Sequence, residues 1–120
     1  MKVLIIVFAV CGVSIFQSAT LSFDKKIYDF KKIKAGKIVE VQFLLTNTSK
    51  KIPLVIYSVS TTCGCTTAKA PKLISPQKSE IIAIKFNSTG YKGLVSKDIV
   101  VITNSSSEYD KLTIKGEVLD

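Results

Sequence analysis

The chain of 120 residues carries 17 lysines against nine acidic residues and contains no arginine, histidine or tryptophan, so its formal net charge is +8 at pH 7. Without arginine the surface lacks the rigid, forked donor that reads guanine or binds phosphate bidentately, which disfavours specific nucleic-acid recognition. Without histidine a serine or cysteine nucleophile has no imidazole base. We therefore expect no enzyme, no cofactor and no metal site of the usual kind.

Residues 1–20 have the pattern of a secretory signal peptide. Lys2 precedes an apolar run over residues 3–10, which continues more weakly to Phe16 and ends in small and polar residues. A transmembrane helix needs about 20 apolar residues, which this run does not reach. We expect cleavage before Thr20 or Leu21, with lipidation at Cys11 or retention as an anchor as the alternatives.

Removal of this segment would leave residues 21–120, the common size of one domain. No transmembrane span is expected after cleavage. We expect this domain to be exported to the periplasm or the cell surface, because it follows a signal peptide. Its lysine excess serves solubility or attraction to an anionic envelope.

Apolar residues in the remaining chain recur with a period of two, which is typical of half-buried strands. The segment KIVEVQFLLTNTS (residues 37–49) is the longest example, because Val39, Val41, Phe43 and Leu45 fall on one face. Further strands are predicted within residues 21–24, 27–33, 53–60, 79–88, 97–104 and 110–118. About seven short strands in roughly a hundred residues predict an all-β, immunoglobulin-like β-sandwich.

The core of this sandwich must be aliphatic and phenylalanine-based, because the chain has no tryptophan and no widely spaced cysteine pair in the predicted domain. Phe23, Phe30, Phe43 and Phe86 are the expected largest members. About a dozen large apolar side chains would each contribute about 1.5 to 3 kcal/mol on burial.

The stretch TTCGCTT places Cys63 and Cys65 on either side of Gly64, followed by Thr66. In an extended strand their Cα atoms would lie about 6.6 Å apart, near the limit for a disulfide, unless Gly64 bends the chain. A ring this small would stabilise the fold by only about 1.6 kcal/mol in the loop-entropy model. A labile disulfide of this kind suits thiol exchange.

Two other interpretations of the cysteines remain open. Two soft donors suit Cu(I), or a metal shared between chains, but not the four-ligand zinc site. Alternatively the pair acts as small apolar residues or as a local clip that closes the turn after the strand of residues 53–60. The spacing does not decide between these readings.

Several segments resemble the bacterial domain-of-unknown-function family numbered 1573. They are residues 23–67 with the Cys-Gly-Cys-Thr motif, FNSTGYKGLVSKDIVVITN (residues 86–104) and LTIKGEV (residues 112–118). The resemblance implies an exported immunoglobulin-like domain with no established activity. This chain departs from the family pattern at Lys31 and Lys32, where a glycine and a small residue are usual, and at Gln77, where a Pro-Gly turn is common.

Together these observations predict a non-catalytic, exported interaction or structural module of the bacterial cell envelope. Its partner would be an envelope protein, bound by strand addition at an open sheet edge, or an anionic envelope polymer attracted by lysine. The alternative function is a thiol redox or soft-metal module centred on Cys63 and Cys65.

Overall fold

The structure is a computed structural model that describes residues 18–120. Most of the predicted signal peptide, including Cys11, lies outside the described residues. At its end, Ala19 is fully buried and forms an isolated parallel bridge with Ser105. The Thr20 N–H donates to Ser49 Oγ over 2.8 Å. These last residues of the predicted leader therefore contact the domain.

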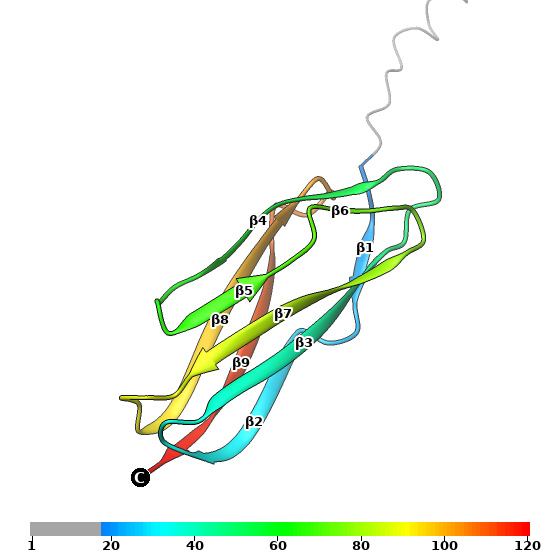
Figure 1. The fold of residues 1–120 in the computed structure, drawn as a ribbon. Coiled ribbons are helices and arrows are strands. Elements are labelled where there is room, and N and C mark those ends of the chain that lie inside the picture. The colour runs from blue at the N-terminus through cyan, green and yellow to red at the C-terminus, as the bar shows by residue number, and fades with distance from the viewer. Residues whose placement is uncertain (1–17) are drawn as a thin grey trace, which may run out of the picture.

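The described residues form two β-sheets packed face to face (Figure 1). The strands are β1 (Leu21–Phe23), β2 (Ile27–Lys34), β3 (Ile38–Asn47), β4 (Leu54–Thr61), β5 (Thr66–Lys69), β6 (Leu73–Ile74), β7 (Ser79–Asn87), β8 (Gly93–Thr103) and β9 (Asp110–Leu119). One sheet has the order β1-β3-β7-β5 and the other β2-β9-β8-β4-β6. All pairings are antiparallel except that of β2 with β9.

This arrangement confirms the predicted all-β sandwich. Every strand expected from the alternating pattern is present, and the structure adds the short strands β5 and β6. With four and two residues, these two are too short to produce a recognisable period of two. Among residues 18–120 no helix is long and apolar enough to cross a membrane.

The core lies between the two sheets and consists of the alternate residues that the sequence pattern assigns to the inner faces. Phe43 and Phe86 are fully buried, Phe30 is almost so, and Phe23 is partly buried and packs against the core cluster. The twelve largest side chains with no appreciable exposure in the described residues are Phe43, Phe86, Leu45, Leu54, Ile74, Ile82, Ile84, Ile99, Leu112, Ile114, Val101 and Val118. The aliphatic and phenylalanine core is therefore confirmed.

The sheet edges are short or interrupted. β1, β5 and β6 contain two to four residues each, and β5 is followed closely by Pro71. β2 is longer, but a bulge between Asp29 and Lys32 shifts its register against β9. Such features make these outermost strands poor templates for another strand, whereas β1 pairs only with Leu45, Thr46 and Asn47 of β3 and leaves the rest of that strand's edge without a partner strand among the described residues.

Candidate functional site

The Cys-Gly-Cys turn carries the chain from one sheet to the other, between the end of β4 at Thr61 and the start of β5 at Thr66 (Figure 1). Thr61 Oγ1 donates to the carbonyl oxygen of Cys63 over 3.2 Å and lies 3.0 Å from that of Thr66. The Thr66 N–H donates to the Cys63 carbonyl over 3.3 Å, and the Asn87 N–H donates to the Cys65 carbonyl over 2.9 Å. Backbone and hydroxyl hydrogen bonds thus fix the turn.

Cys63 and Cys65 form a disulfide bond, with their Cα atoms 5.4 Å apart. This separation is shorter than the 6.6 Å of an extended strand because the chain bends at Gly64. Gly64 is exposed, and a β-carbon added to it would have no neighbour within 4 Å. Both cysteines are partly exposed. Thr66, the last residue of the motif, is buried with its Oγ1 3.7 Å and 3.6 Å from the sulfur atoms of Cys63 and Cys65.

Tyr91 adds a hydroxyl group to this disulfide from a distant part of the chain. Its Oη lies 3.0 Å from the Sγ atom of Cys65 and 3.8 Å from that of Cys63. The Tyr91 ring packs edge-on against the buried ring of Phe86, with ring centroids 5.3 Å apart. Lys97 Nζ lies 4.6 Å from the centroid of the same ring, which is within cation–π range.

Sequence reasoning missed Tyr91 and Lys97. Tyr91 follows Cys65 by 26 residues and Lys97 lies on β8, so no local spacing connects either residue to the motif. In sequence, Lys69 is the nearest cation to the cysteines. The only local signal was an aromatic residue in the short run from Gly90 to Gly93, which itself was part of the family-like segment.

The described residues contain no group of three or more histidine, cysteine or acidic residues that could hold a metal ion. The two sulfur atoms of the motif are joined to each other and are therefore not free ligands. A soft-metal site would require reduction of this bond.

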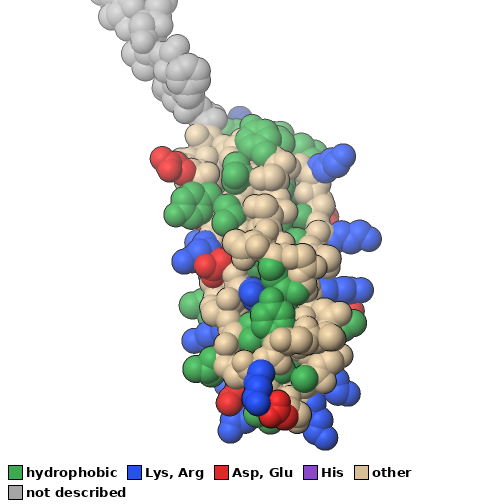
Figure 2. Space-filling view, turned by 90° about the vertical axis from the view of Figure 1, so that its left-hand side faces the viewer, with side chains coloured by type: hydrophobic (Ala, Val, Ile, Leu, Met, Phe, Trp, Pro, Cys, Tyr) green, Lys and Arg blue, Asp and Glu red, His purple; other side chains and the backbone are tan. Residues whose placement is uncertain are grey.

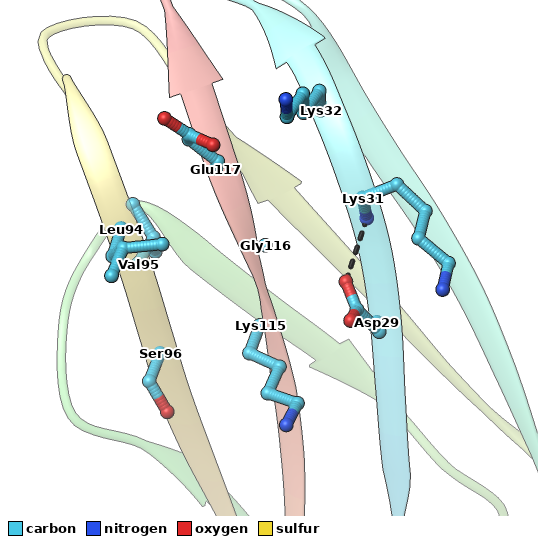
Figure 3. A pocket seen from close by; sticks show the side chains of 9 residues that line it. All are labelled: Asp29, Lys31, Lys32, Leu94, Val95, Ser96, Lys115, Gly116 and Glu117. Carbon is cyan, nitrogen blue, oxygen red and sulfur yellow. Dashed lines mark hydrogen bonds between the residues drawn. The ribbon is translucent and has the colours of Figure 1, made fainter.

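A second feature is a groove of about 790 Å³ on the outer side of the five-stranded sheet, where β2, β9 and β8 lie side by side (Figure 3). Gly116 lies in its centre with no side chain, between Leu94 on β8 and Lys31 on β2. Leu94 is 88% exposed. The full lining is Asp29, Lys31, Lys32, Leu94, Val95, Ser96, Lys115, Gly116 and Glu117.

The groove carries charges of both signs, with one more lysine than carboxylates. Its lining includes three lysines and two carboxylates. One carboxylate is already engaged, because Asp29 Oδ1 accepts a hydrogen bond of 2.8 Å from the Lys31 N–H. Figure 2 shows that lysines are also frequent on a neighbouring face of the molecule, with apolar side chains in scattered groups between them.

Two of the residues that depart from the family pattern, Lys31 in the bulge beside this groove and Gln77, have an unusual backbone conformation. Lys31 has a φ of 66°, and Gln77 has a φ of 63°; these are the only non-glycine residues with positive φ in the described part of the chain. Both occupy positions at which the resembling family commonly carries glycine. At both positions the backbone therefore has the positive φ that favours glycine, although the residue is not glycine.

Residues 21–118 match the family described as "Protein of unknown function (DUF1573)". The chain belongs to this family. The match covers nearly the whole predicted domain and includes the Cys63–Cys65 motif. A comparison with curated proteins found no match.

Solved structures with the same fold are distant in sequence. A protein of unknown function from Porphyromonas gingivalis W83 is 19% identical with a TM-score of 0.74, over 89% of this chain and 50% of that one. The ASH / PapD-like domain 7 of human CEP192 is 13% identical with a TM-score of 0.69, over 90% and 91%. The Vibrio cholerae VesB protease is 12% identical with a TM-score of 0.63, over 83% and 32%.

These likenesses establish the fold alone, because such low identities do not transfer function. This chain spans only half the length of the Porphyromonas gingivalis structure.

Proposed function

We propose that this family member is an exported, non-catalytic binding module of the bacterial envelope, and that the groove of β2, β9 and β8 takes up an acidic protein segment with an apolar side chain. The single observation that carries the proposal is Leu94, a large apolar residue that is 88% exposed in a groove lined by three lysines and two carboxylates. A large apolar side chain that projects among charged ones can act as the anchor for a bound protein segment.

The short or interrupted outer strands favour binding at the groove over the addition of a ligand strand to a sheet edge. The edge strands are either two to four residues long or, in β2, interrupted by the bulge at Lys31. A ligand strand would find few consecutive free backbone groups on these strands, so strand addition would have to use the parts of β3 and β4 that β1 and β6 do not cover. An apolar anchor also distinguishes a protein segment from an anionic polymer, which would need only the lysines.

Binding of defined peptides tests the groove. We expect acidic peptides that contain leucine or phenylalanine to bind more tightly than polyglutamate. Leu94→Ser should weaken binding about tenfold, because it removes an apolar side chain that the bound peptide would cover. Leu44→Ser is the matched control, because Leu44 is a moderately exposed leucine on the outer face of the other sheet.

Charge reversal tests whether binding depends on the lysines of the groove or on lysines anywhere on the surface. Lys32→Glu with Lys115→Glu should abolish binding, whereas Lys50→Glu with Lys51→Glu, in the exposed segment between β3 and β4, should retain most of it. Equal losses in both pairs, with polyglutamate binding as well as the peptides, would instead identify an anionic polymer as the partner.

Export is tested separately. Cell fractionation and N-terminal sequencing of the native protein should recover it outside the cytoplasm with its chain starting near Thr20 or Leu21. Recovery of an intact N-terminus from the cytoplasm would contradict the envelope role without affecting the groove.

A further inference from the structure

We propose that the Cys63–Cys65 disulfide exchanges stoichiometrically with an external thiol, that Cys63 is the sulfur attacked, and that Tyr91 stabilises Cys65 as the leaving thiolate. This chemistry goes beyond binding and does not depend on the groove. It requires one disulfide per molecule and no turnover.

The position of the Tyr91 hydroxyl makes the two sulfur atoms chemically different. Its Oη lies within hydrogen-bonding distance of both, but at 3.0 Å from Cys65 Sγ and 3.8 Å from Cys63 Sγ. A phenolic O–H is a better donor to a thiolate than to a neutral sulfur, because hydrogen bonds to ionised groups are stronger. Exchange is faster when the leaving sulfur is stabilised as a thiolate. Cys65 is therefore the better leaving group.

The hydroxyl is held in place by packing. The Tyr91 ring contacts the fully buried Phe86 edge-on at 5.3 Å between centroids, and Lys97 Nζ lies over the ring at 4.6 Å. Lys97 and Cys65 thus both contact the Tyr91 side chain, and a positive charge near a thiolate favours the ionised form. A donor fixed before the reaction loses little freedom when the thiolate forms.

The turn is held by more than the disulfide. Thr61 and Asn87 bind the carbonyl groups of the two cysteines through hydrogen bonds that do not involve sulfur. Both cysteines are partly exposed, so an external thiolate has access to Cys63. The bond can therefore open while the turn keeps its shape.

The step balances as an ordinary exchange. The sulfur of an external thiolate bonds to Cys63 Sγ, the Sγ–Sγ bond breaks, and its electron pair stays on Cys65 Sγ, which accepts the hydrogen bond from Tyr91. A second external thiol then attacks the mixed disulfide, so that two thiols are oxidised to one disulfide while Cys63 and Cys65 are reduced.

The reaction of the native protein with glutathione tests this inference. Cysteine thiols that the reaction frees are trapped with N-ethylmaleimide, and mass spectrometry then shows which cysteine carries glutathione and which carries the maleimide. We expect glutathione on Cys63 and the maleimide on Cys65, at a rate at least about tenfold above that of the oxidised peptide TTCGCTT, which has the same ring without Tyr91. Tyr91→Phe keeps the ring packing and should slow the reaction about tenfold and distribute glutathione over both cysteines.

Controls keep the result specific to this hydroxyl. Tyr109→Phe, at an exposed tyrosine between β8 and β9, should leave rate and attack site unchanged. Lys97→Gln keeps Tyr91 and should slow the reaction at low salt, with a weaker salt dependence than the wild type. The inference fails if the protein reacts no faster than the peptide, if glutathione goes to Cys65, or if Tyr91→Phe matches the wild type. None of these outcomes bears on peptide binding in the groove.

Discussion

Phe30 lies directly over Gly116, so that a β-carbon added to Gly116 would fall 2.3 Å from two atoms of the Phe30 ring. Gly116 is on β9, and Phe30 is on the neighbouring strand β2, within the bulge between Asp29 and Lys32. The same ring stacks on Phe86 of the other sheet, with centroids 5.8 Å apart. The glycine thus makes room for an aromatic contact between the two sheets.

Gly116→Ala is therefore expected to destabilise the fold by about 1 to 3 kcal/mol, the usual cost of overpacking a well-filled core. The measurement is urea denaturation followed by circular dichroism. Gly64→Ala is the control, because its β-carbon would meet nothing within 4 Å, and it should change stability little. In the background of Phe30→Ala the cost of Gly116→Ala should largely disappear, and a cost that persists would contradict the steric explanation.

Replacement of Lys31 or Gln77 by glycine is expected to stabilise the protein. Both residues have positive φ, which costs an L-residue about 1 to 2 kcal/mol. Gln77 follows Pro76 in a turn closed by the hydrogen bond from Lys78 N–H to Ser75 C=O, a position that favours glycine. After the entropy cost of glycine, a gain of about 0.5 to 1 kcal/mol remains for each variant.

The same denaturation measurement checks this gain. Lys34→Gly, in β2 without positive φ, should instead lose about 0.5 to 1 kcal/mol. A loss of stability in both Lys31→Gly and Gln77→Gly would show that their side chains contribute more than the backbone conformation costs.

Removal of the disulfide should have a small effect on stability. The double variant Cys63→Ser, Cys65→Ser is expected to lose at most about 1.6 kcal/mol, because the three-residue ring restricts the unfolded chain little. Phe86→Ala, which empties a buried site, should cost about 3 to 5 kcal/mol. If the two variants lost the same amount of stability, the disulfide would be a main support of the fold, and its role would be structural.

Asp24 should make part of the stability pH-dependent. Although desolvation opposes its ionisation, hydrogen bonds from the Leu44 N–H and from Lys25 hold the pKa of Asp24 below its ordinary value of 3.8. A depressed folded-state pKa stabilises the fold above the unfolded-state value, and this contribution is lost as pH falls through the folded-state value. The stability gap between wild type and Asp24→Asn should therefore be constant above about pH 5 and shrink below pH 3.8.

Denaturation midpoints of both proteins between pH 2.5 and pH 7 measure this gap. A gap that stays constant down to pH 2.5 would mean that the carboxylate of Asp24 does not depend on its bonds to β3.

The sequence by itself determined the fold class and most of the core. Alternation in residues 37–49 and 79–88 is a local signal, since successive side chains of a strand point to opposite faces, and the predicted inner residues Phe43 and Phe86 are indeed buried. The Cys-Gly-Cys-Thr motif likewise indicated the family, because its specificity lies in adjacent residues.

Only the tertiary structure decided what surrounds the motif and where a groove forms. The contact of Tyr91 with Cys65 joins residues 26 positions apart, and the groove requires β2, β8 and β9 to lie side by side. Such juxtapositions depend on strand order, which no local periodicity encodes. The short strands β5 and β6 likewise depend on the tertiary structure. They are strands because they pair with β7 and β4, and their own residues show no strand pattern.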